Sequence, residues 1–510
     1  MQDKRSLPTS EPPPYPMGSE PEKAKQNSQT NLTNQVSQPD NGGVQEPVNK
    51  GLPDIKSESV KAPSFPPSSP PSGQQKRGLP KKFIVLALFL GVLSVVAFLF
   101  LKFRSLPSTT LLGNEGEIVW WGIQHELSTY QPLIDEFEKE NPNIKIKYER
   151  QSTTDYRVRL VSALLSGKGP DIFEIHNSWA PMFRNDLSTL PQSVMSKEEF
   201  AASFYPVVVS NLTLDKGVVG MPLEYDALTL FINEDVFASA LKSPPEIWSE
   251  VQTISTELTQ KDGGKIIQGG VALGITENVD HWQEIFAFMM LQNRVNPASP
   301  TGKPAADVFS FYKFFSGNKV WNNSLPSSTV AFSRGELAMY FGPTRRASEI
   351  IKSNSNLKFR TVKLPQLPKN NPTDPNYSYA TYWFQGVSDK SKVKEGSWTF
   401  LKFLSREDSL RKLNENIKRA ESIGRIYPRP AMNLDLVQDQ IFGSVVSLAY
   451  DAKSWYLAGN TFDGEDGINT QVGTLFERVI SAWPGGGQKE LENTTKELSQ
   501  VLGKYGIKTR

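Results

Sequence analysis

The sequence of 510 residues contains no cysteine. This absence excludes disulfides, thiolate metal sites, a cysteine nucleophile and a lipid-modified cysteine in this chain. Only three histidines are present, His125, His176 and His281, and none of their spacings matches a metal-ligand pair on one helix. The 56 lysines and arginines nearly balance the 54 aspartates and glutamates, so the net charge of +2 predicts no nucleic-acid partner.

The sequence also lacks the short motifs of common enzymes. It has no Gly-rich phosphate loop, no Gly-x-Ser-x-Gly elbow and no kinase signature. Catalysis needs a nucleophile with a base, carboxylates paired in different environments, or a metal. We therefore expect a protein that is not an enzyme and that uses neither a cofactor nor a metal.

One long apolar run stands out at residues 83–101, in which Ser94 is the only weakly polar residue. At about 1.5 Å per residue, a helix of this length spans a bilayer core of about 30 Å. Basic residues flank the run, at Lys76, Arg77, Lys81 and Lys82 before it and at Lys102 and Arg104 after it. The heavier positive side predicts a single-pass protein of the cell membrane, with a cytoplasmic N-terminus and an extracellular C-terminal domain. A cleaved secretory signal and a buried core helix are the alternatives.

The region before this run, residues 1–80, is rich in proline, serine and glutamine. Such a composition cannot bury enough apolar surface to offset the loss of chain entropy, so we predict a disordered cytoplasmic tail. The cluster Pro12-Pro13-Pro14-Tyr15-Pro16 is either a docking motif or part of a flexible leash. Residues 105–116 are predicted to be an outer linker.

From residue 117 the pattern changes to alternating strands and helices. Apolar residues predict strands at 117–123, 144–148 and 171–175, with amphipathic helices at 127–140 and 155–165 between them. This order predicts right-handed crossovers and a mostly parallel sheet, which is an α/β fold.

In such sheets ligands gather at the carboxyl ends of the strands. The residues at these ends are Trp120, Trp121, Gln124, Glu174, His176, Asn177 and Trp179. Indole rings beside carboxylate, amide and imidazole groups suit a carbohydrate, which stacks its C–H face and bonds its hydroxyls. Because neighbours on a strand point to opposite faces, one of the two adjacent tryptophans is expected in the core.

Several segments occur in the order seen in one protein family. They are 117–122, Gly169-Pro170-Asp171-Ile172-Phe173, Gly220-Met221-Pro222 with the run 225–233, Pro244-Pro245-Glu246-Ile247-Trp248, and the run 331–339. In series, over about residues 117–483, they resemble family 1 extracellular solute-binding proteins, the maltose-binding-like receptors of ABC importers.

The resemblance implies a two-lobed periplasmic-binding-protein-like (type II) fold with the ligand between the lobes. The lobes would comprise residues 117–226 and 381–436 for one, and 227–380 and 437–508 for the other. The crossings would bring further residues to the cleft, namely Tyr225, Asp226, Trp282, Tyr382, Trp383, Gln385 and Trp455. Asn233 would cap the helix that follows it.

The turn Gly342-Pro343-Thr344-Arg345-Arg346 departs from the family pattern, which often has an aromatic residue after Gly-Pro. Arg345 or Arg346 would form a bidentate contact with a carboxylate or phosphate, or else lie at a solvated helix start.

Two functions remain open. The resemblance implies a membrane-anchored receptor that binds a sugar or oligosaccharide and hands it to ABC permease subunits. The long tail instead favours a sensor or adhesion module that uses the same fold and recruits a partner through the tail.

Overall fold

The computed structural model describes residues 116–369, 371 and 373–509, all of which lie in one compact unit of the chain. The predicted tail, the apolar run 83–101 and nearly all of the predicted linker lie outside the described residues. Within the described ranges, no helix has the length and apolar character that crossing a bilayer requires.

The first sheet has the strand order β12-β3-β1-β2. Its strands are β1 (Gly116–Gly122), β2 (Ile144–Arg150), β3 (Ile172–His176) and β12 (Trp383–Val387). β1 is parallel to both β2 and β3, as predicted, whereas β12 is antiparallel to β3. Every residue of β3 is buried, because the sheet is covered on both faces.

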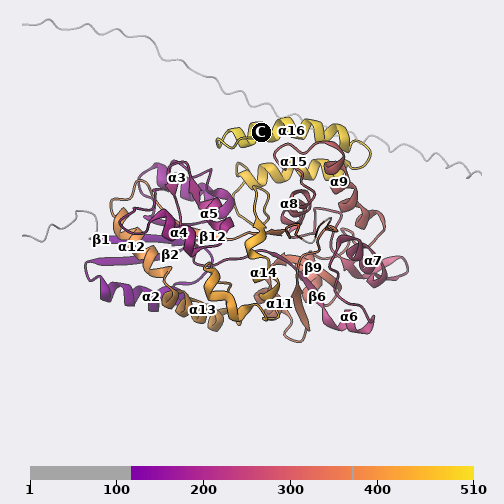
Figure 1. Ribbon diagram of the computed structural model, residues 1–510, viewed down its shortest axis with the longest axis horizontal. Coiled ribbons are helices and arrows are strands. Elements are labelled where there is room, and N and C mark those ends of the chain that lie inside the picture. The colour runs from indigo at the N-terminus through magenta and orange to yellow at the C-terminus, as the bar shows by residue number, and fades with distance from the viewer. Residues whose placement is uncertain (1–115, 370, 372, 510) are drawn as a thin grey trace, which may run out of the picture. The chain divides into compact units, whose positions relative to one another are not determined.

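Helices cover this sheet, and Figure 1 shows them around its strands. They include α2 (Leu127–Glu140), α3 (Tyr156–Leu165), α12 (Lys394–Leu404) and α13 (Glu407–Glu421). α2 has the predicted bounds and buries residues at helical spacing, including Tyr130, Leu133 and Phe137. α2 packs against α12 and α13, so segments far apart in the sequence share one layer.

The second sheet has the order β10-β6-β9-β8-β7. Its strands are β6 (Leu228–Asn233), β7 (Gln260–Asp262), β8 (Lys265–Val271), β9 (Leu337–Pro343) and β10 (Phe359–Val362). β8 and β9 are parallel and the other neighbours are antiparallel. The Asn233 side chain accepts a hydrogen bond from the Val236 amide at 3.3 Å, which confirms the predicted helix cap.

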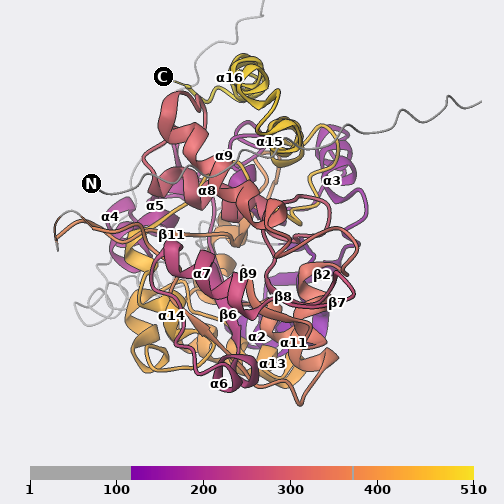
Figure 2. The same ribbon diagram turned by 90° about the vertical axis from the view of Figure 1, so that its right-hand side faces the viewer.

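Helices surround the second sheet as well (Figure 2). They are α6 (Glu234–Ser239), α7 (Trp248–Leu258), α8 (Trp282–Gln292), α9 (Gly302–Gly317), α10 (Ser328–Ser333), α11 (Arg346–Ser353), α15 (Ile468–Ala482) and α16 (Gly487–Gly503). The remaining elements are short: η1 (Asn177–Trp179), α4 (Lys197–Ser203), α5 (Pro206–Leu212), β4 (Thr213–Leu214), β5 (Gly217–Val218), β11 (Ser378–Tyr379), η2 (Pro430–Leu436), α14 (Gly443–Val446), η3 (Ala449–Asp451) and β13 (Ala452–Lys453).

Two hydrophobic clusters divide the described chain. The first, here lobe 1, draws buried residues from 118–227 and 380–452, and the second, lobe 2, draws them from 228–379 and 457–502. The chain therefore passes between the lobes three times. The sequence places the last passage at residue 437, whereas apolar residues up to Ala452 pack in the first cluster.

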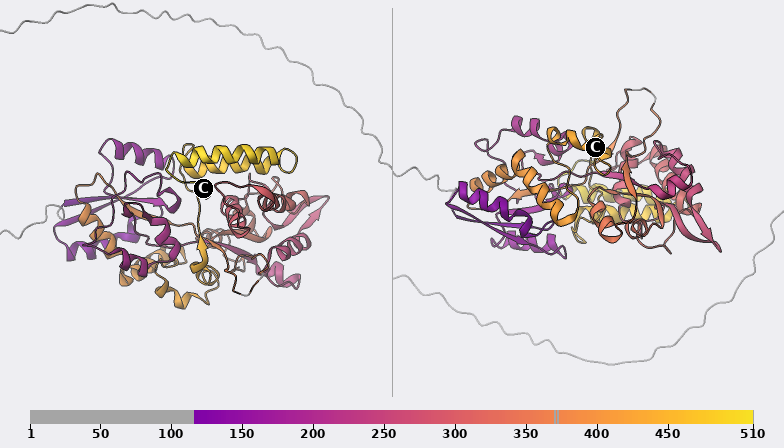
Figure 3. Two further views of the ribbon diagram at one scale, coloured as in Figure 1. Left: turned by 45° about the horizontal axis from the view of Figure 1, so that its top comes forward. Right: turned by 90° about the horizontal axis from the view of Figure 1, so that it is seen from below.

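The lobes touch each other through the start of α15 and the loop before it. The side-chain amide of Asn469 donates to Ser178 Oγ at 2.8 Å, and the Phe462 ring stacks on Trp383 with the ring centroids 6.4 Å apart. Arg157 on α3 donates to the Asp463 carbonyl. In Figure 3, α16 lies alongside α15, and the two helices border both lobes. The structure thus shows the lobes closed upon one another.

Candidate functional site

A small cavity lies between the lobes, at the ends of β1, β3 and β12. It has about 20 Å³ of free space, enough for about one water molecule. Its lining residues are Gln124, Tyr130, Glu174, Leu223, Glu224, Tyr225, Asp226, Arg345, Tyr382, Trp383, Gln385 and Arg425. A sugar ring is much larger than a water molecule, so a ligand of that kind enters only after the lobes separate.

A carboxylate and an amide lie side by side in the lobe 1 wall. Glu174 on β3 and Gln385 on β12 are directly opposite in the antiparallel register, so their side chains point to the same face. The indole of Trp120 donates to Gln385 Oε1 at 2.8 Å, which leaves the amide nitrogen free. The Ile123 and Gln124 amides donate to Glu174 Oε2 at 2.7 and 3.1 Å. Among the described residues, neither the acceptor Glu174 Oε1 nor the neighbouring donor Gln385 Nε2 has a hydrogen-bond partner, so both are available to a ligand.

Aromatic rings form much of the remaining wall. Tyr225 and Tyr382 have ring centroids 6.0 Å apart, and Trp383 lies edge-on to Trp179 at 5.8 Å. The Tyr382 hydroxyl donates to Asn211 at 3.2 Å. The buried Tyr225 hydroxyl, in contrast, has no hydrogen-bond partner among the described residues. One wall of the cavity is therefore largely apolar, and it carries the Tyr225 hydroxyl, which a ligand could hydrogen-bond.

Asp226 holds the turn that follows β9. Its Oδ1 accepts hydrogen bonds from the amide and hydroxyl of Thr344 at 2.8 and 2.7 Å, and its Oδ2 accepts one from the Arg345 amide at 3.0 Å. The Arg345 guanidinium then lies 3.5 Å from Asp226 Oδ2. Asp226 is a positioning residue in this state, since its carboxylate is saturated by the turn.

A network of four charged side chains in lobe 1 adjoins the cavity, and two of them, Glu224 and Arg425, belong to its lining. His125 Nε2 is 2.5 Å from Glu224 and its Nδ1 is 3.0 Å from Glu421. Arg425 lies 3.3 Å from Glu224 and also pairs with Glu421. The His125 and Arg425 side chains are only 3% and 10% exposed, so water screens these pairs weakly.

The network changes the pKa of its members. Burial alone would lower the pKa of His125, but the charges and hydrogen bonds of Glu224 and Glu421 raise it to about 10. Burial alone would raise the pKa of Glu421, yet the hydrogen bond with His125 and the charge of Arg425 lower it to about 2. Burial raises the pKa of Glu174, although the hydrogen bonds from the Ile123 and Gln124 amides and the charge of His125 act in the opposite direction.

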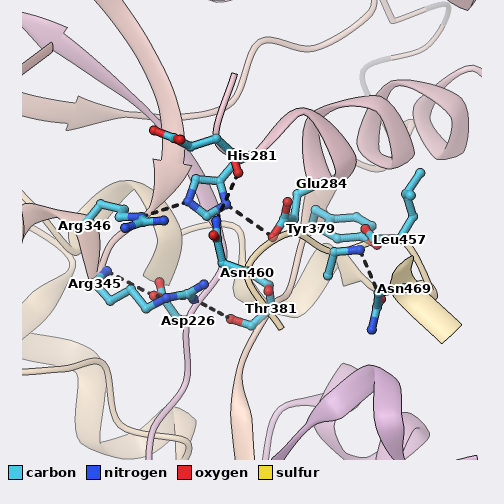
Figure 4. A network of polar contacts seen from close by, with 12 residues as sticks. Asp226, His281, Glu284, Arg345, Arg346, Tyr379, Thr381, Leu457, Asn460 and Asn469 are labelled. Carbon is cyan, nitrogen blue, oxygen red and sulfur yellow. Dashed lines mark hydrogen bonds and ion pairs between the residues drawn. The ribbon is translucent and has the colours of Figure 1, made fainter. Parts of the chain in front are cut away.

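A second polar network starts at Arg346 in lobe 2 (Figure 4). Arg346 Nε donates to His281 Nε2 at 2.9 Å, so the hydrogen of this imidazole is on Nδ1, which faces Glu284 at 3.4 Å. Arg346 also pairs with Glu349 at 2.5 Å. Burial lowers the pKa of His281, which keeps this imidazole neutral. Arg346 is therefore paired within lobe 2 and does not line the cavity.

The cavity brings together many of the residues that the sequence predicts for the site. They are Gln124, Glu174, Tyr225, Asp226, Arg345, Tyr382, Trp383 and Gln385. The residues missed are Tyr130, Leu223, Glu224 and Arg425. Glu224 directly precedes the predicted Tyr225, which was the one available clue, whereas Tyr130 carries only the helical spacing of a core residue.

Other predicted residues lie outside the lining of this cavity. Trp120 is in the core of lobe 1, as expected for one of the two tryptophans, and Trp121 donates to Glu149 at 2.9 Å. His176 is buried between Ser178 and Thr381. Aromatic and amide side chains also pack in protein interiors, and the other predicted residues do so. Asn177 donates to Asn211, Trp179 stacks on Phe183, Trp282 lies in the core of lobe 2, and Trp455 packs against Phe476.

Within the described ranges, no group of three or more histidine, aspartate or glutamate side chains is arranged to hold a metal ion. The acidic residues near the cavity are paired with basic side chains or backbone amides. The geometry is thus that of a cleft with polar and aromatic walls.

Comparison with known proteins identifies relatives of the chain. A family model described as bacterial extracellular solute-binding protein matches residues 121–409. Two relatives carry provisional names. A binding protein of Brucella abortus (strain 2308) is 22% identical over 294 residues, 56% of this chain and 71% of the relative. An ABC transporter periplasmic-binding protein of Escherichia coli (strain K12) is 22% identical over 305 residues, 56% of this chain and 67% of the relative.

Solved structures share the fold. The sugar-binding protein MalE of Xanthomonas citri has a TM-score of 0.61 at 18% identity, covering 76% of this chain and 98% of that chain. A solute-binding protein of Thermotoga lettingae bound to α-D-tagatose has a TM-score of 0.60 at 18% identity, covering 76% and 100%. A substrate-binding protein of Listeria monocytogenes in complex with cycloalternan has a TM-score of 0.60 at 16% identity, covering 77% and 100%. The α/β two-lobed architecture is therefore that of MalE-like binding proteins.

Proposed function

Because the chain belongs to the bacterial extracellular solute-binding protein family, we propose that it binds a carbohydrate between its lobes and delivers it to the permease of an ABC importer. Members of this family bind solutes and are not enzymes. The ligand class is supported by structural neighbours that hold tagatose and cycloalternan. The transporter context is supported by the relative named for an ABC system.

The observation that carries this proposal is the pairing of Glu174 and Gln385. A free carboxylate oxygen beside a free amide N–H₂ matches two adjacent hydroxyls of a sugar, one of which donates while the other accepts. Trp383 and Tyr382 line the same cavity and offer faces for the C–H side of the ring.

Transport would use opening and closing of the lobes. The closed cavity has room for about one water molecule, so the ligand must bind to an open form and replace the direct contacts between the lobes. A ligand that bridges Glu174 in lobe 1 and Arg345 after β9 would then favour closure, and the closed form would dock on the permease.

We also propose that residues 83–101, outside the described ranges, anchor the protein in the cell membrane with the binding domain outside. In this protein the helix takes the place of a lipid anchor, since no cysteine is present to carry a lipid. Membranes washed with alkaline carbonate should retain the full chain, and a chain lacking 83–101 should be released. Release of the full chain would contradict the anchor.

Carbohydrate binding is tested by thermal shift and calorimetry on the full chain, in a detergent without a sugar head group. We expect one member of a panel of neutral mono- and oligosaccharides to stabilise the fold by about 2.7 kcal/mol at 100 times its dissociation constant. Replacing Trp383 with alanine removes a cavity wall and should weaken binding by about 10-fold or more.

The matched control is Tyr450→Ala. Tyr450 is an aromatic residue of lobe 1 that is 66% exposed and lies outside the cavity lining. Its loss should leave the affinity within about threefold, since it removes no wall of the cavity. Equal losses in both variants, or no binding to any carbohydrate of a broad panel, would contradict the proposed function.

A further inference from the structure

One carboxylate at the cavity lacks a counter-ion. Glu224 pairs with His125 and Arg425, and Asp226 lies 3.5 Å from the Arg345 guanidinium. Within the described part of the chain, Glu174 forms no ion pair with any basic side chain. It is only 4% exposed, and among the described residues its carboxylate accepts hydrogen bonds from two backbone amides alone, both at Oε2.

A count of the charged groups around the cavity also leaves one carboxylate without a counter-ion. The acidic groups that line it or pair with its lining are Glu174, Glu224, Asp226 and Glu421, and the basic groups are His125, Arg345 and Arg425. One negative charge therefore remains uncompensated when all of these groups are ionised. Burying a carboxylate without a counter-ion is unfavourable, and a cation brought by the ligand would relieve that cost.

The walls near Glu174 suit a cation as well as a sugar. Tyr130, Tyr225, Tyr382 and Trp383 line the cavity, and aromatic ring faces attract positive charge. The buried Tyr225 hydroxyl has no hydrogen-bond partner in the part of the chain that the structure describes, so its oxygen can accept a hydrogen bond from an ammonium group. An ammonium group carries three donors and no acceptor, which matches Glu174 Oε1 and a free hydroxyl oxygen.

We propose that the ligand is an amino sugar, or an oligosaccharide containing one, whose ammonium group pairs with Glu174. This inference rests on the proposed function, because it takes the same cavity and adds the charge of the ligand. Gln385 Nε2 donates to a neighbouring ring hydroxyl, and Trp383 contacts the ring. An N-acetylated sugar lacks the positive charge and so leaves Glu174 uncompensated.

The pKa of Glu174 also responds to a bound cation. Burial raises the pKa of Glu174, and the charged or titratable groups around it are His125, Glu224, Tyr130, Tyr148 and Tyr156. The free carboxyl group thus holds a proton more readily than an exposed glutamate does. An incoming ammonium favours the ionised form of this carboxyl and so lowers its pKa. Neutral sugars accept or donate hydrogen bonds there without changing the charge.

The test compares sugars that differ in one substituent. Glucose is titrated into the full chain beside its 2-amino, 3-amino and 6-amino deoxy analogues and N-acetylglucosamine, and the set is repeated with the corresponding β-1,4-linked disaccharides. We expect at least one amino sugar to bind about 10-fold to 100-fold more tightly than its neutral parent, the range for a hydrogen bond to a charged group. The N-acetyl analogue should show no such gain.

Glu174→Gln is the diagnostic variant, since glutamine keeps the shape and an acceptor for the two backbone amides. It should reduce the preference for the amino sugar to within about threefold, as the charge alone is removed. Glu136→Gln is the matched control, because Glu136 pairs with Lys412 on the outside of lobe 1. Circular dichroism and the midpoint of thermal unfolding verify that both variants fold.

A second measurement needs no variant. Calorimetry of the wild-type chain at several pH values should show that the preference for the amino sugar shrinks as acidification protonates the Glu174 carboxylate, because the ammonium group then loses its counter-ion. Equal or tighter binding of neutral sugars, or a preference that survives Glu174→Gln, overturns the inference and leaves the proposed function intact. If ethanolammonium, titrated beside these sugars, binds and no sugar does, the cation pairing holds and the carbohydrate function fails. If no compound binds, both fail.

Discussion

Replacing Arg425 with methionine should lower the free energy of unfolding by about 3–5 kcal/mol, the usual cost of breaking a buried ion pair from one side. Arg425 lies 3.3 Å from Glu224, also pairs with Glu421, and is 10% exposed. Without it, two carboxylates that water reaches poorly are left with His125 as their only cation. Methionine keeps most of the apolar stem, so loss of charge dominates the change. Denaturant unfolding of the full chain measures it.

An exposed ion pair provides the control for this measurement. Lys303 is 83% exposed and lies 2.7 Å from Asp307 on the same helix. Lys303→Met should change the free energy of unfolding by less than about 0.5 kcal/mol, because exposed pairs contribute little. If the Arg425 variant lost no more than the Lys303 variant, the buried network would not stabilise lobe 1.

Stability should also fall as the pH rises from about 6.5 to about 10. The folded chain keeps His125 protonated up to its raised pKa of about 10, whereas the unfolded chain releases this proton near 6.5. The folded state therefore binds one more proton inside this window, and each pH unit removes about 1.4 kcal/mol of stability. Below pH 6.5 the contribution of His125 is complete and constant.

The variant His125→Gln isolates this effect. Glutamine does not titrate, so the slope that belongs to residue 125 should vanish, while groups common to both proteins titrate in parallel. We expect the stability difference between wild type and variant to shrink steadily from pH 6.5 to 10, as measured by denaturant midpoints at several pH values. A difference that stayed constant across this range would show that residue 125 is neutral in the folded state.

Local patterns in the sequence were sufficient for the first strands and helices of lobe 1. The apolar spacing of residues 127–140 predicts α2 with its observed bounds, and the strand predictions at 144–148 and 171–175 fall on β2 and β3 within a few residues. The rule that ligands gather at strand ends predicted Gln124 and Glu174 as neighbours, and both line the cavity. These successes rest on short-range periodicity, which a single sequence contains.

Local sequence patterns could not predict which charged residues pair with one another. His125 is 99 residues from Glu224 and 296 residues from Glu421 along the chain, so no spacing rule links them. Residue type alone also does not distinguish an aromatic side chain of the cleft from one of the core. Trp282 and Trp455 pack with lobe 2, for example, whereas Trp383 lines the cavity. The two arginines of the turn look alike in the sequence, yet Arg345 faces the cavity and Arg346 pairs with Glu349.

The triple passage between lobes has a consequence for how the protein is made. Lobe 1 needs β12 and the His125–Glu421 contact, whose partners are 296 residues apart. At about 5–20 residues per second, a ribosome takes about 15–60 s to synthesise that interval. Until β12 is made, β1, β2 and β3 lack the strand that completes their sheet, and His125 lacks Glu421 until the end of the interval. The nascent chain is thus exposed to aggregation and proteolysis until most of lobe 2 has been translated.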